Sequence, residues 1–175
     1  KYDGELSTRN YWREWLGNTH RTVPTGFSCH GNQPETMSTL EVSAKLERDD
    51  EAGIENLRCA SDIRRAKRFQ TLSEMILRQQ GTMGGGNHFL EIQRDADDNL
   101  WMMVHSGSRN IGFQIANYYA KLAVEVNTRL GQEFAPHLNW LSLSEPEGQD
   151  YLSDMQWAVD YALLNRKEML RSALA

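Results

Sequence analysis

Gly81–Gly112 reads GTMGGGNHFLEIQRDADDNLWMMVHSGSRNIG, and the rest of the chain is organised around this stretch. Two runs of strand length, Asn87–Gln93 and Asn99–His105, flank the acidic turn Asp95–Asp98. Short apolar or alternating runs joined by a turn-rich loop are typical of a β-hairpin. We therefore expect an antiparallel hairpin with a glycine-rich approach and a polar exit.

The length of the turn decides which residues face each other. If Arg94 pairs with Asn99 across a four-residue loop, His88 falls opposite His105. Directly paired residues point to the same face of a sheet, with Cβ atoms roughly 4.5–5.5 Å apart. The two imidazoles could then bind one metal ion or two adjacent ions. A shift of one residue would place them on opposite faces.

Both ends of the predicted hairpin carry groups suited to anions. Gly84–Gly86 have no Cβ atoms, so backbone or ligand can approach closely before the first strand. A strand rather than a helix follows these glycines, which is not the arrangement of a P-loop. After the second strand, free backbone N–H groups at a helix start, two hydroxyls and a guanidinium predict a phosphate or oxyanion site. The side chains of this site are Ser106, Ser108 and Arg109.

GTMGGGNHFLEI and VHSGSRNIG, at the spacing seen here, resemble the central motifs of the RtcB-type RNA-splicing ligases. The resemblance continues at VPTGFSCH (residues 23–30) and through residues 147–170. It implies that His88 and His105 are ligands of a two-ion manganese site. It also implies a GTP site lined by Asn87, His88, Phe89, Leu90 and Glu91.

The activity that the resemblance implies is GTP- and manganese-dependent RNA ligation. Such an enzyme joins RNA 3′-phosphate or 2′,3′-cyclic phosphate ends to 5′-hydroxyl ends, as in tRNA splicing and RNA repair. Its RNA partners would be tRNA halves or broken RNA. Imidazole suits manganese and zinc alike, so the histidine pair by itself does not select the metal.

The family pattern also includes groups that have no match here. The family supplies an Asp-x-x-Cys ligand pair upstream, a third metal histidine downstream and a guanylated histidine near the C-terminus. Gly26 and Asn56 stand three residues before Cys29 and Cys59. The remaining histidines lie outside the matching motifs: His20, His30 and His137. We therefore expect residues 1–175 to be a single domain from the middle of a longer ligase, inactive alone.

Two alternatives remain open. One is a metal-dependent phosphodiesterase or nuclease that uses the same histidines without a guanylated intermediate. The other is a non-catalytic fragment that keeps the fold. Binding of metal and GTP separates them, because a nuclease needs no GTP and an inert fragment binds neither.

Apolar residues at three- and four-residue spacing predict about three amphipathic helices packed with the hairpin, an α+β fold. The first begins around Ile63 and ends near Gly81, and the second runs over Ile111–Val126 with Ser108 as N-cap and Gly131 as terminator. The third covers Gln149–Leu170.

Composition narrows the expected partners and location. The net charge is −5, so RNA binding needs a local patch rather than a global basic field. The basic residues between Arg64 and Arg68 form either a solvated helix face or a patch for an RNA backbone. Two cysteines make no disulfide framework, and no apolar run reaches the roughly 18 residues of a membrane span. The expected location is the cytoplasm.

Overall fold

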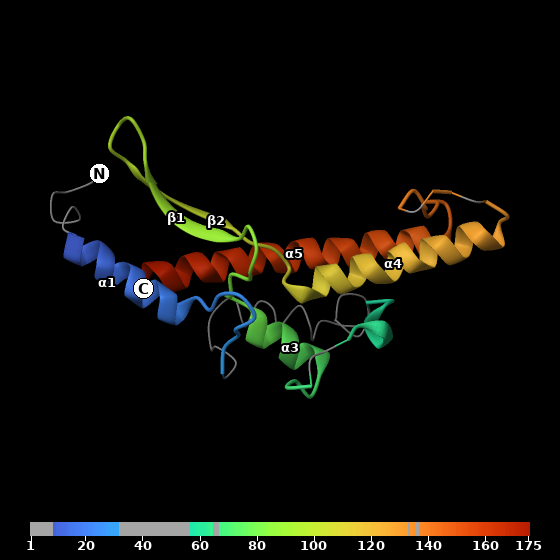
Figure 1. Ribbon diagram of the computed structural model, residues 1–175, viewed down its shortest axis with the longest axis horizontal. Coiled ribbons are helices and arrows are strands. Elements are labelled where there is room, and N and C mark those ends of the chain that lie inside the picture. The colour runs from blue at the N-terminus through green and yellow to red at the C-terminus, as the bar shows by residue number, and fades with distance from the viewer. Residues whose placement is uncertain (1–8, 32–56, 65–66, 133, 136) are drawn as a thin grey trace.

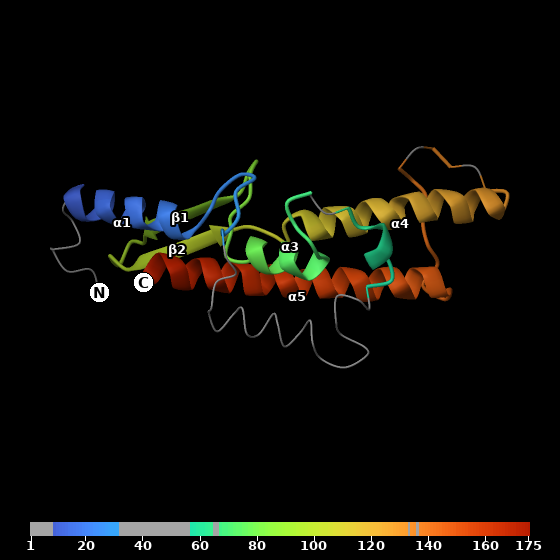
Figure 2. The ribbon, with the colours of Figure 1, turned by 90° about the horizontal axis from the view of Figure 1, so that it is seen from below.

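The computed structural model describes residues 9–31, 57–64, 67–132, 134–135 and 137–175. In this part of the chain the fold is α+β, as expected, with four α-helices and one two-stranded antiparallel sheet. The long helix α5 (Pro146–Leu174) forms the axis of an elongated molecule (Figure 1). Helix α4 (Asn110–Arg129) runs antiparallel beside its N-terminal half, and α1 (Arg9–Thr22) lies near its C-terminal end (Figures 1 and 2).

Strands β1 (Phe89–Arg94) and β2 (Leu100–His105) form the expected antiparallel hairpin. The expected register is wrong by one residue, because Phe89 rather than His88 pairs with His105. His88 therefore precedes β1 and belongs to the glycine-rich approach.

The hairpin turn explains this difference in register. The N–H of Asp95 donates to the carbonyl of Asn99 at 3.0 Å, and Asp98 adopts a left-handed φ of 62°. A tight turn followed by a left-handed residue makes a bulged loop, which is one residue longer than the loop expected. Hydrogen bonds from Trp101 and Asn99 lower the pKa of the Asp95 carboxyl to about 2. The turn is thus organised by an acidic side chain at its first position.

Helix α3 (Leu72–Gln79) is shorter than the predicted helix, which began at Ile63. The hydroxyl of Thr71 accepts the N–H of Glu74 at 3.0 Å, and the Glu74 carboxylate accepts the N–H of Gln70 at 2.6 Å. This reciprocal capping fixes the helix start and competes with a longer helix. Arg65, part of the predicted basic face, lies outside the described residues.

Helix α4 ends as expected but begins differently. Gly131, with φ of 71°, follows the last turn as a left-handed terminator. Arg109, not Ser108, occupies the N-cap position, and it makes no side-chain cap hydrogen bond. The predicted Ser108 cap is therefore wrong, because the chain enters the helix through the left-handed backbone of Arg109.

Helix α5 extends beyond the predicted Gln149–Leu170 at both ends. Pro146 takes the first helical position, where its fixed φ suits the helix and its missing N–H costs nothing. Gly148 allows the preceding loop to pass closely, since a Cβ there would clash with the Ser142 carbonyl. Among the helices of the described residues, none combines the length and apolar character that crossing a membrane requires.

The apolar core joins α3, α4, α5 and residues 57–63, which include a short 3-10 helix, η3 (Ala60–Asp62). Its buried members are Leu57, Cys59, Ile63, Ile76, Leu77, Ile111, Ile115, Tyr119, Trp157, Ala158 and Tyr161.

One buried carboxylate ties three parts of this core together. Asp154 of α5 is 1% exposed and accepts the N–H groups of Arg58 and Cys59, at 3.1 and 3.2 Å. It also accepts the Tyr119 hydroxyl of α4 at 2.8 Å. Burial and this carboxylate raise the pKa of Tyr119, so the hydroxyl stays a donor.

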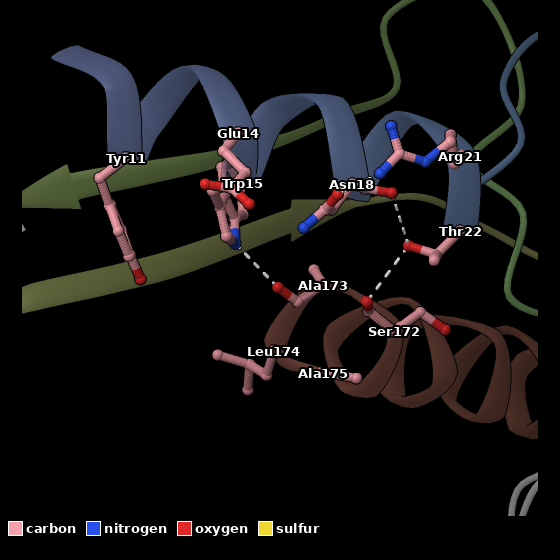
Figure 3. Close-up of a pocket in the computed structure, with 10 residues that line it drawn as sticks. All are labelled: Tyr11, Glu14, Trp15, Asn18, Arg21, Thr22, Ser172, Ala173, Leu174 and Ala175. Carbon is pink, nitrogen blue, oxygen red and sulfur yellow. Dashed lines mark hydrogen bonds between the residues drawn. The ribbon is translucent and has the colours of Figure 1, made fainter.

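A pocket of about 520 Å³ lies between α1 and the C-terminal turns of α5 (Figure 3). Trp15 Nε1 donates to the Ala173 carbonyl at 2.8 Å, and the Thr22 hydroxyl donates to the Ser172 carbonyl at 3.2 Å. No residue of Gly81–Gly112 lines this pocket, so it is separate from the histidine pair.

Candidate metal and phosphate site

His88 and His105 converge although they are not paired across the hairpin. Their ring centroids are 5.7 Å apart with an interplanar angle of 59°. Strand alternation does not govern His88, because it lies before β1. Phe89 stacks on His105, with centroids 5.5 Å apart, and so orients that ring. The two imidazoles thus lie close together, as predicted, but not because the residues pair across the hairpin.

One nitrogen of this imidazole pair lacks a hydrogen-bond partner. His88 Nδ1 is buried and has no hydrogen-bond partner among the described residues. A buried polar atom without a partner is costly and calls for an explanation such as an ion. Neutral imidazole nitrogen is also the commonest protein ligand for metals. Two converging imidazoles with an orphan nitrogen therefore fit part of a metal site.

The described residues hold no cluster of three or more His, Cys, Asp or Glu side chains placed to bind a metal. Catalytic zinc sites, for comparison, use three protein ligands and one open position. A metal site built on His88 and His105 would therefore need further ligands.

Gly84 lies next to both the Arg109 guanidinium and the His88 imidazole. Its φ is 96°, a left-handed value that favours glycine. A Cβ built there would clash with Arg109 Nη1 and would lie 2.5 Å from His88 Nδ1. The guanidinium and the imidazole therefore both pack against bare backbone.

Arg109 is a half-buried cation that has no counter-charge among the described residues. Its Nη2 donates to the Gly26 carbonyl at 2.9 Å, whereas its Nε is buried and unpartnered. No described carboxylate lies within salt-bridge distance of it. Burial lowers the pKa of the guanidinium, which shows the cost of holding this charge away from water. A phosphate would supply the missing counter-charge in the bidentate geometry that arginine favours.

The two serines of the predicted phosphate site differ in availability. The Ser106 hydroxyl is buried, donates to the Met83 carbonyl at 2.7 Å and accepts from Asn165. The Ser108 hydroxyl lies over the first turn of α4, against Gly112. Ser106 therefore serves the local fold, and a phosphate in this region would depend chiefly on Arg109.

The residues predicted for the GTP site lie along β1 and just before it. Asn87 is exposed, and Phe89 is 38% exposed on the face that carries His105. Leu90 is half-buried on the opposite face, paired with Val104. The Glu91 carboxylate accepts Gln93 Nε2 at 2.6 Å.

Asn165 of α5 links the two histidine-bearing segments, and the sequence interpretation missed it. The residue is fully buried; its Oδ1 accepts the Thr82 N–H at 3.2 Å. Its Nδ2 donates to the carbonyls of Thr82 and Gly107 at 3.1 and 3.0 Å, and lies 3.3 Å from Ser106 Oγ. A signal existed, because Asn165 stands one helical turn from Tyr161 and from Met169 on the buried stripe.

Comparison with known proteins shows which family the sequence matches. Residues 6–175 match the family model described as tRNA-splicing ligase RtcB. RNA-splicing ligase RtcB1 of one Escherichia coli strain is 39% identical to this chain over 95 residues. RNA-splicing ligase RtcB of a second strain gives the same figures. The match covers 54% of this chain and 23% of each relative, so it spans about a quarter of their length.

Proposed function

Because the chain belongs to the tRNA-splicing ligase RtcB family, we propose that it contributes a metal- and phosphate-binding part of an RNA ligase. The proposed reaction joins RNA 3′-phosphate or 2′,3′-cyclic phosphate ends to 5′-hydroxyl ends, with GTP and manganese. The observation that carries the proposal is the pair of imidazoles 5.7 Å apart, beside an arginine that no described carboxylate pairs with.

Each residue has a proposed task in this site. His88 and His105 would hold manganese, whose charge would neutralise phosphate and polarise a nucleophile. Arg109 would bind a phosphate oxygen of the RNA end. Phe89 keeps the His105 ring oriented by stacking on it. The β1 segment Asn87–Glu91 would face GTP.

The substrates proposed for the whole protein are tRNA halves or broken RNA, and its proposed location is the cytoplasm. Both proposals follow from the family. A nuclease that used the same histidines would differ from the proposed ligase in needing no GTP.

The first prediction concerns metal binding. The His105→Ala variant should bind manganese at least about tenfold more weakly than the unmodified chain, because even loss of an outer-sphere partner costs that much. Isothermal titration calorimetry with MnCl₂ measures the affinity. His20→Ala, an exposed histidine on α1, is the matched control and should leave the affinity unchanged. Equal affinity in all three proteins would remove the histidine pair from the metal site.

The second prediction concerns covalent chemistry. Incubated with labelled GTP and manganese and then denatured, this chain should retain no label. Covalent guanylation needs a nucleophile, and no histidine here lies in a motif that matches the family's guanylated one. A complete Escherichia coli relative, treated identically, is the positive control. A stable adduct on His20, His30 or His137 would contradict the prediction and identify a displaced nucleophile.

A further inference from the structure

A second recess opens beside Arg109. The pocket has a volume of about 370 Å³, and its lining includes Phe27, Arg68, Phe69 and Gly85 as well as Arg109. Among the described residues that line it, none is acidic, whereas two are arginines. The pocket therefore suits an anion, and through Arg109 it is continuous with the proposed phosphate site.

Phe27 is an exposed aromatic ring on a firmly held backbone. Its exposed fraction is 94%, yet the preceding Gly26 N–H donates to the Gly84 carbonyl at 2.8 Å. The Phe27 carbonyl accepts Arg68 Nη2 at 3.0 Å, and the Gly26 carbonyl accepts Arg109. The backbone that carries the ring is thus held beside the glycine-rich turn, and the ring itself is open to solvent.

Arg68 supplies a cation beside the backbone of Phe27, through its hydrogen bond to the Phe27 carbonyl. Its guanidinium carbon lies 4.9 Å from the centroid of the Phe69 ring, and it forms no salt bridge with a described carboxylate. Arg78 lies over the same ring at 5.4 Å, but it pairs with Glu74 at 2.9 Å. Arg68 is therefore the cation left available for an external phosphate.

We propose that this pocket binds one nucleotide of single-stranded RNA, with the base stacked on Phe27 and its phosphate on Arg68. The inference rests on the proposed function, which supplies RNA as the partner, and it adds a place where the strand leading to the reacting end is held. An aromatic platform beside a cationic groove binds single strands without sequence preference, because every base has a face that can stack. A purely phosphate-binding pocket would have no use for an exposed phenyl ring.

The experiment measures binding of a short single-stranded RNA labelled with 2-aminopurine, whose fluorescence falls when the base stacks. Phe27→Ala should weaken binding about tenfold and abolish the quenching at one labelled position. Arg68→Gln should reduce the slope of log affinity against log salt by about 0.7, the value of one lost phosphate contact on a single strand. The matched controls are Phe134→Ala and Arg129→Gln, on exposed residues outside this pocket.

The outcomes separate the inference from the proposed function. If the unmodified chain binds RNA and the Phe27 and Arg68 variants behave like their controls, the nucleotide pocket is wrong while RNA binding stands. If the unmodified chain binds no RNA at 50 mM salt, both the RNA partner of this chain and the pocket are overturned.

Discussion

Replacing Asn165 by leucine should lower the free energy of unfolding by about 3–5 kcal/mol, because buried groups on two loops lose their partner. The leucine side chain has similar size but neither donates nor accepts. The Thr82 N–H and carbonyl would be left buried without this hydrogen bond, and the part-buried Gly107 carbonyl would lose it too. Chemical denaturation measures the change, and Asn117→Leu on the exposed face of α4 is the control.

The same variant should weaken manganese binding in protein that is still folded. Thr82 lies on the chain that leads to His88, and Gly107 lies just beyond His105. Asn165 therefore holds both histidine segments at a fixed separation, and their relaxation would raise the cost of assembling the proposed metal site. Titration with MnCl₂ in the absence of denaturant reports this effect separately from stability. A stability loss no larger than that of Asn117→Leu would show that the loops do not depend on Asn165.

The hairpin was predictable because its signal is local, whereas its register was not. Two apolar runs and an acidic turn identify the strands, but the loop length depends on the left-handed residue Asp98. Glycine or asparagine at that position is the usual marker of such a bulged turn. The aspartate gave no such marker, so the pairing was placed one residue away.

The start of α3 was missed for a different reason. Apolar periodicity from Ile63 onward favoured a long helix, but Thr71 and Glu74 form a local capping pair that starts the helix later. The motif is visible in the sequence, and it outweighs periodicity because it satisfies backbone N–H groups directly.

The connection between α5 and the site could not be read from local sequence at all. Asn165 contacts groups 58 and 83 positions away, so its partners depend on how α5 packs rather than on any neighbouring residue. What the sequence offers is a polar side chain on a buried helical stripe, which predicts a satisfied hydrogen-bonding role without naming the partners.

Gly84→Ala should be the most damaging change in the glycine-rich turn, lowering the free energy of unfolding by about 2–4 kcal/mol. An alanine would be strained at φ of 96°, and its Cβ would also clash with Arg109 and crowd His88 Nδ1. Both side chains would move, so manganese affinity and anion binding should fall together.

Gly86→Ala separates the two causes of this effect. Gly86 also has a left-handed φ, of 77°, but a Cβ there meets no atom within 4 Å. This control should carry only the backbone strain of about 1–2 kcal/mol and should keep its manganese affinity. Unfolding by denaturant and titration with MnCl₂ give the two quantities for both variants. If Gly84→Ala and Gly86→Ala proved equal in both measurements, close packing of the guanidinium and imidazole against Gly84 would have no part in the site. A larger loss at Gly84 in both measurements would mean that the bare backbone is what brings Arg109 and His88 together.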